Sequence, residues 1–112
     1  MIAPRRFLPS ISALLSFEAV VRLGTATAAA QELNLTQSAV SRQIKTLEEQ
    51  LGVSLMIRQG RRLTPTQAGL DYVTQVRDIL NRLAQASVSA RTNPTGGTLD
   101  LAILPAFGMH WL

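Results

Sequence analysis

Hydrophobic side chains recur at helical spacing along the first half of this 112-residue chain. The first stretch predicts a helix over residues 10–23, with Ser10 or Ser12 as its N-cap. Gly24 is expected to end this helix, because glycine adopts the left-handed conformation without strain. The apolar positions that share one face of it are Leu14, Phe17, Val20 and Val21.

A short helix and a longer one are expected next. Thr25 or Thr27 caps the short helix, 28–33, in which three successive alanines favour helix and let another helix approach closely. After a tight connection, Thr36 caps a helix that runs to residue 51. Its core face carries Val40, Ile44, Leu47 and Leu51. Its opposite face carries Gln37, Ser38, Ser41, Arg42 and Lys45.

A small hairpin follows the third helix. Strands are expected over residues 53–57 and 63–64, joined by a turn at Gln59 and Gly60. The basic residues around this turn are Arg58, Arg61 and Arg62. A short helix, a turn, a longer helix and a basic hairpin together have the form of a winged helix-turn-helix.

A long fourth helix is expected to begin at Thr66, after Pro65, and to continue to about residue 90. Its apolar residues form a narrow seam with four-three spacing, which suits another long helix better than a globular core. The seam consists of Tyr72, Val76, Ile79, Leu83, Ala86 and Ala90, and is widened by Val73 and Leu80. The favoured interpretation is a homodimer or higher oligomer, and the alternative is a module that forms mixed dimers with longer relatives.

The last part of the chain predicts a hinge and one strand. A cluster of helix breakers occupies 92–97, and alternating residues over 98–103 predict a strand. Because one strand is not a stable sheet, we expect the chain to be a fragment or truncated product of a longer protein. The expected organisation is a winged helix-turn-helix domain (1–65), a linker or dimerisation helix (66–91), and a hinge with a truncated segment (92–112).

Composition narrows the class of protein. Hydrophobic residues make up 46% of the chain and aromatic residues 4%, which favours a mainly α fold whose helices pack through aliphatic side chains. The net charge of +4 indicates a polyanionic partner, either nucleic acid or an anionic membrane surface, or a modest excess that aids solubility. The chain has no cysteine and one histidine, His110, so neither a disulfide framework, a metal site nor a cofactor is expected.

The N-terminal residues offer an alternative interpretation. Arg5 and Arg6 precede apolar residues, as in a twin-arginine export signal. Pro9 and Glu18 interrupt the apolar run, however, and a cytoplasmic location is expected instead. No uninterrupted apolar run reaches the roughly 18 residues of a transmembrane helix.

The third helix carries the chemistry expected of a major-groove reader. Gln37 suits adenine or a phosphate, and Arg42 suits guanine or a phosphate. Ser38 and Ser41 are short enough to let the helix lie close to the bases, while Lys45 suits the DNA backbone. Thr36 and the free amides of the first turn also favour a phosphate. The alternative, a merely solvated helix face, is disfavoured by the neighbouring short helix and basic hairpin.

The three wing arginines and one serine–lysine pair have more than one interpretation. Arg61 suits the minor groove, whereas Arg58 and Arg62 suit phosphates or solvent. Ser41 and Lys45 lie one turn apart and resemble a nucleophile with its base. No residue pattern supplies an oxyanion hole or a lowered lysine pKa, so an enzyme is not expected.

The stretch from Leu14 to Gly69 resembles the N-terminal domain of LysR-type transcriptional regulators. The resemblance is carried by residues 17–20, Ala29, Ala30, Leu33, residues 36–44, residues 47–52, Leu55, Thr66, Ala68 and Gly69. Residues 104–107, with Trp111 and Leu112, resemble the start of the effector domain in the glycine-cleavage activator branch.

The resemblance implies a DNA-binding dimer that recognises an interrupted palindrome in double-stranded DNA. It also implies that residues 92–112 are a hinge and the truncated start of an α/β effector domain, with a small-molecule effector only in a full-length version. It also implies that Gln37, Ser38, Ser41, Arg42 and Arg61 contact DNA. The positions that depart from the family pattern are Ala26 for an aromatic residue, Ala28 for a basic one, Met56 for Phe and Ala106 for a hydroxyl residue.

Overall fold

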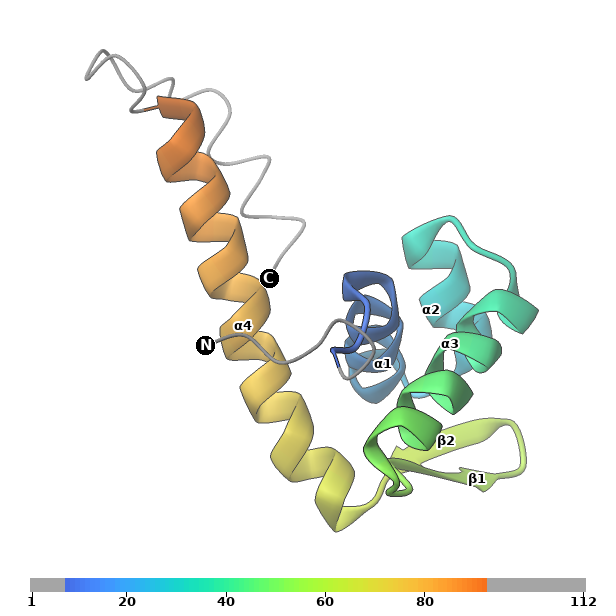
Figure 1. Cartoon of the computed structure of the whole chain (residues 1–112). Helices are drawn as coiled ribbons and strands as arrows, with labels where there is room; N and C mark the ends of the chain where they lie inside the picture. The colour runs from blue at the N-terminus through green and yellow to red at the C-terminus, as the bar shows by residue number, and fades with distance from the viewer. Residues whose placement is uncertain (1–7, 93–112) are drawn as a thin grey trace. The chain divides into compact units, whose positions relative to one another are not determined.

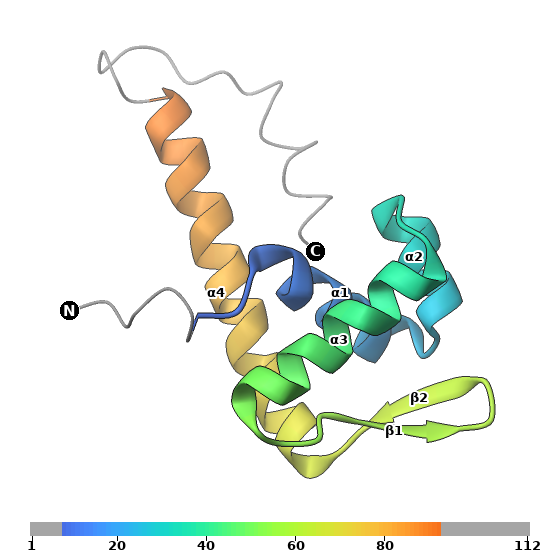
Figure 2. The ribbon, with the colours of Figure 1, turned by 45° about the vertical axis from the view of Figure 1, so that its right-hand side comes forward.

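The computed structural model describes residues 8–92, which form four helices and one two-stranded sheet (Figure 1). The expected strand over 98–103, His110 and Ala106 lie outside the described residues. The chain divides into two compact units, the first ending at Thr74 and the second beginning at Gln75. Figures 1 and 2 show α1, α2 and α3 packed together in the first unit, with the hairpin beside α3.

Helix α1 spans Ile11–Leu23, and α2 spans Ala26–Leu33. Ser10 is the N-cap of α1, where its side chain accepts a hydrogen bond from the Ala13 amide at 3.1 Å. Thr25 caps α2 in the same way. Because Thr25 and not Thr27 is the cap, α2 begins two residues earlier than the sequence predicts.

Helix α3 spans Gln37–Leu51, with Thr36 as its N-cap, so its prediction is confirmed. The preceding turn is tight because Asn34 adopts the left-handed conformation, with φ of 57° and ψ of 42°. The expected core face is buried at Val40, Ile44 and Leu47 and half-buried at Leu51.

The hairpin consists of β1 (Met56–Gln59) and β2 (Arg62–Pro65), paired antiparallel with Met56 opposite Pro65. Strand β1 begins three residues later than predicted, because Glu48 of α3 binds the chain where the strand begins. Its carboxylate accepts hydrogen bonds from the amides of Leu55 (2.7 Å) and Met56 (3.2 Å). The turn comprises Gly60 and Arg61 rather than Gln59 and Gly60.

Helix α4 spans Gln67–Thr92, and its first turn is fixed to the base of the hairpin. Thr66 accepts a hydrogen bond from the Gly69 amide (3.0 Å), and its hydroxyl donates to the Ser54 carbonyl (2.7 Å). A Cβ atom at position 69 would lie 2.1 Å from the Leu55 carbonyl oxygen, so only glycine permits this approach.

Among the described residues of the first unit, the core is aliphatic apart from one aromatic pair. Phe17 is fully buried, and its ring centroid lies 5.7 Å from that of Tyr72, at an interplanar angle of 40°. The buried Ser16 hydroxyl donates a hydrogen bond to the side-chain oxygen of Gln43, which ties α1 to α3. Among the described residues, every buried side-chain polar atom has a hydrogen-bond partner.

An ion-pair cluster links the exposed ends of α1 and α2. Arg22 of α1 bridges Glu18, at 3.1 Å, and Glu32 of α2. The hydrogen bonds from Arg22 hold the pKa of the Glu32 carboxyl below its usual range, and the same bonds raise the pKa of Arg22. This cluster therefore adds a charged link between α1 and α2 to their aliphatic packing.

Candidate nucleic-acid interface

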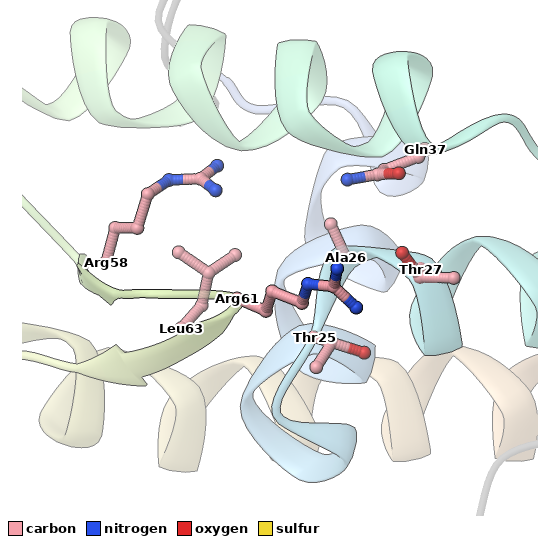
Figure 3. A pocket seen from close by; sticks show the side chains of 7 residues that line it. All are labelled: Thr25, Ala26, Thr27, Gln37, Arg58, Arg61 and Leu63. Atoms are coloured by element: carbon pink, nitrogen blue, oxygen red, sulfur yellow. The ribbon is translucent and has the colours of Figure 1, made fainter.

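A cleft of about 450 Å³ lies between the hairpin and the starts of α2 and α3 (Figure 3). It is lined by Thr25, Ala26, Thr27, Gln37, Arg58, Arg61 and Leu63. Three segments far apart in the sequence therefore meet at one surface. The two arginines make this surface positive, and no acidic residue is among those that line it.

The hairpin supplies the positive charge of the cleft. Arg58 comes from β1 and Arg61 from the turn, and both are exposed. Figure 3 shows the Arg58 guanidinium pointing toward α3 and that of Arg61 pointing toward Thr25 and Thr27. The cleft therefore brings these two arginines together with Gln37.

The opposite wall of the cleft is made by two helix starts. Thr25 and Thr27 come from the first turn of α2, and Gln37 is the first residue of α3. A helix N-terminus carries a partial positive charge and free amide donors, so the starts of α2 and α3 both favour an anion. Between the two threonines, Ala26 presents only a methyl group, which leaves the cleft open.

The remaining predicted residues of α3 lie along its outward face. Ser38, Arg42 and Lys45 are exposed, and Ser41 is half-buried. Thr36 is also exposed, and its hydroxyl oxygen accepts a hydrogen bond from the Ala39 amide at 3.1 Å. A continuous polar and basic face therefore extends along α3 from the cleft.

Arg62 is placed differently from the other two hairpin arginines. It begins β2, and its guanidinium lies against Gly24 in the turn between α1 and α2. The structure thus brings Arg58 and Arg61 together at the cleft and directs Arg62 to another neighbour.

Sequence reasoning treated Thr25 and Thr27 only as alternative helix caps. The structure assigns the cap to Thr25 and places both residues in the cleft, with the Thr27 side chain exposed. One feature of the sequence indicates this second role. Only one of the two threonines can cap α2, so the hydroxyl of the other is available for another contact.

The predicted seam of α4 is exposed only in part. Val76 is fully buried, and Tyr72 is half-buried. The exposed members are Ile79, Leu83, Ala86 and Ala90, with 48% of Ile79 and 39% of Leu83 accessible. The two positions expected to widen the seam are both buried (Val73 and Leu80). The accessible part of the seam therefore begins at Ile79.

Residues 8–92 hold no group of three or more potential metal-ligating side chains. None of the helices in the described part of the chain combines the length and the hydrophobicity that a membrane span requires.

The helix–turn–helix of α2 and α3, followed by the basic hairpin, defines a winged helix-turn-helix protein. Residues 11–70 match the family described as "Bacterial regulatory helix-turn-helix protein, lysR family", which is more than half of the chain. The chain therefore belongs to the LysR family, and the resemblance inferred from its sequence is confirmed. This is a family of transcriptional regulators and not of enzymes.

Among curated relatives, the chain is 40% identical over 105 residues to the glycine cleavage system transcriptional activator of Escherichia coli K12. This match covers 94% of the chain and 34% of the relative, so the chain spans about a third of that protein's length.

Solved structures agree with the fold. The structure of BenM_DBD with catB site 1 DNA has a TM-score of 0.74 at 30% identity, and covers 80% of this chain and 99% of that one. The CbnR_DBD–DNA complex has a TM-score of 0.70 at 33% identity, and covers 73% and 94%. The predicted mainly α, winged helix-turn-helix fold is thereby confirmed.

Proposed function

We propose that this protein binds double-stranded DNA sequence-specifically and regulates transcription, with α3 in the major groove and the hairpin as its wing. The observation that carries the proposal is the cleft in which Arg58 and Arg61 face Gln37 and the start of α2. A phosphate between two grooves fits such a surface, because it is an anion that must be held while side chains on either side read the bases. Binding of DNA by BenM_DBD and CbnR_DBD supports the proposal.

The contact proposed for each residue follows from its position in the structure. Arg42 and Ser38 lie on the outward face of α3 and are proposed to read base edges, together with Gln37 and Ser41. Thr36, Lys45 and Arg58 are proposed to contact phosphates, and Arg61 to enter the minor groove. The proposal requires the protein to work in the compartment that holds the DNA.

We further propose that the protein binds as a dimer through α4 to an interrupted palindrome. The exposed apolar residues from Ile79 to Ala90 support a helix–helix contact, since an unpaired apolar stripe on a long helix gains stability from a second copy. Two recognition helices would then enter major grooves separated by about one helical turn or a multiple of it. Sedimentation of Ile79→Asp/Leu83→Asp should give a monomer, whereas a dimer would refute this interface.

The function is tested by selecting duplexes from a random pool with the intact chain, then measuring their affinity by fluorescence anisotropy. We expect a palindromic consensus and an affinity that falls steeply with salt. Arg42→Ala should weaken binding to the selected duplex by about 1–3 kcal/mol and relax the preference at one position of each half-site.

A matched control distinguishes base reading from general charge. Arg77→Ala also removes one exposed arginine, but from α4, and Arg77 is not among the residues proposed to contact DNA. It should leave the selected consensus unchanged. The proposed function is refuted if no consensus emerges, or if Arg42→Ala and Arg77→Ala are indistinguishable on the selected duplex.

A further inference from the structure

Arg62 occupies the space that a side chain at position 24 would need. A Cβ atom added to Gly24 would lie 2.8 Å from Nη2 of Arg62 and 3.3 Å from its Cζ. The next residue along β2, Leu63, lines the cleft. Because successive side chains of a strand point to opposite faces, Arg62 projects from the other face of the hairpin.

Gly24 is the point at which α1 ends and the hairpin is attached. It adopts φ of 88° as the C-cap of α1, and its amide donates a hydrogen bond to the Val20 carbonyl at 2.8 Å. Its own carbonyl accepts a hydrogen bond from the Leu63 amide at 2.9 Å. The backbone bond and the Arg62 side chain therefore attach β2 to the same buried residue.

The electrostatics of this position favour a cation. The C-terminal end of a helix carries a partial negative charge from its last carbonyl groups, and a guanidinium beside it is stabilised. At the same time, the carbon stem of an arginine can pack on neighbouring backbone while its head reaches water. Arg62 can therefore stabilise this attachment although the residue as a whole is exposed.

We propose that Arg62 is a positioning residue for the wing and not a DNA contact. Together with the Leu63–Gly24 hydrogen bond, it holds the hairpin against the end of α1, and thereby directs Arg58 and Arg61 toward the starts of α2 and α3. This assignment replaces the phosphate contact or solvation expected for Arg62 from the sequence. Its consequence for affinity rests on the proposed DNA-binding function, but the attachment itself does not.

The attachment is tested without DNA, by a double-mutant cycle in urea unfolding. Gly24→Ala should lower the unfolding midpoint in the wild-type background, because the new methyl displaces Arg62 and because φ is positive. In the Arg62→Ala background the same change should lower the midpoint less, since only the backbone strain remains. Arg58→Ala is the control background, in which the full effect should persist. Equal shifts in all three backgrounds would overturn the proposal.

Hydrogen exchange gives a second measurement that does not depend on Gly24→Ala folding. In Arg62→Ala, the Leu63 amide should exchange at least several-fold faster than in the wild type, because the bond to Gly24 opens more often. In Arg61→Ala its exchange should be unchanged. An unchanged Leu63 rate in Arg62→Ala would show that the side chain does not hold the hairpin.

The salt dependence of DNA binding then separates positioning from contact. On a labelled random-sequence duplex, a lost phosphate contact should reduce the slope of log affinity against log salt by about one. We expect this loss for Arg58→Ala, and for Arg62→Ala a several-fold weaker affinity with an unchanged slope. A slope reduced by about one in Arg62→Ala would make it a phosphate contact. If the wild type does not bind the duplex, the proposed function fails while the cycle and the exchange still test the attachment.

Discussion

Glu48 offers a direct test of how the recognition helix and the hairpin are joined. Its carboxylate accepts hydrogen bonds from the amides of Leu55, at 2.7 Å, and Met56, at 3.2 Å. Both residues are buried, with 1% and 9% of their surface exposed, so water cannot easily replace the acceptor. Glu48→Ala therefore leaves two amide donors without their partner.

The expected cost follows from these two bonds. A hydrogen bond to a charged group contributes about 1.5–3 kcal/mol, and the longer of the two should contribute less. We expect Glu48→Ala to lower the free energy of unfolding by about 2–4 kcal/mol, a large part of a typical total of about 5–15 kcal/mol. Glu48→Gln keeps a carbonyl acceptor without the charge and should cost about 1 kcal/mol.

Urea unfolding followed by circular dichroism measures the effect. With slopes typical of small domains, Glu48→Ala should shift the midpoint downward by roughly 1–2 M. The neighbouring Glu49→Ala is the matched control, because it removes an exposed carboxylate from the same helix and should change stability by less than about 0.5 kcal/mol. If Glu48→Ala is no less stable than Glu49→Ala, the two amide bonds do not support the hairpin as argued.

Two further predictions concern titratable groups. The hydrogen bonds from Arg22 depress the pKa of Glu32, so the stability they supply is present above the unfolded pKa of about 4.3 and is lost as the pH falls through the folded pKa. On acidification from about pH 6 to pH 3, Glu32→Gln should therefore lose less stability than the wild type. The difference should be at most about 1 kcal/mol, because the ion pair is exposed. An identical pH profile of the two proteins in urea unfolding would contradict this. Burial raises the pKa of Tyr72, the single tyrosine of the chain, so absorbance titration should place its ionisation above the usual value of about 10, and the shift should disappear in urea. Stability should correspondingly fall as the pH rises above about 10, and a normal pKa in the folded protein would show that the Phe17–Tyr72 contact does not exclude water.

The helical part of the fold was predictable because its signals are local. The Thr36 N-cap and the core face from Val40 to Leu51 lie within one segment and agree with one another, and α3 has the predicted bounds. The bounds of the hairpin were predicted wrongly, because its start depends on Glu48, which lies seven residues before Leu55 and belongs to another element. No residue pattern within the strand indicates that bond.

The candidate site was predictable as a set of residue types but not as an arrangement. Three neighbouring arginines look equivalent in sequence, yet Arg58 and Arg61 line the cleft and Arg62 lies against Gly24. Their separation depends on strand alternation and on a turn that is one residue further along than expected. Thr27 was missed for a related reason, since its place in the cleft follows only when Thr25 takes the cap.

The anchoring of the first turn of α4 has a consequence for chimeric regulators. A protein engineer who exchanges DNA-binding domains would naturally cut the chain at Pro65, where the hairpin ends. With that junction, Ser54 and Leu55 would come from this chain, while the residues that contact them, Thr66 and Gly69, would be replaced by those of another regulator. Any residue larger than glycine at position 69 would clash with the Leu55 carbonyl. A chimera should therefore keep the first turns of α4 from this chain and join the other regulator's sequence after Thr74, where the first compact unit ends.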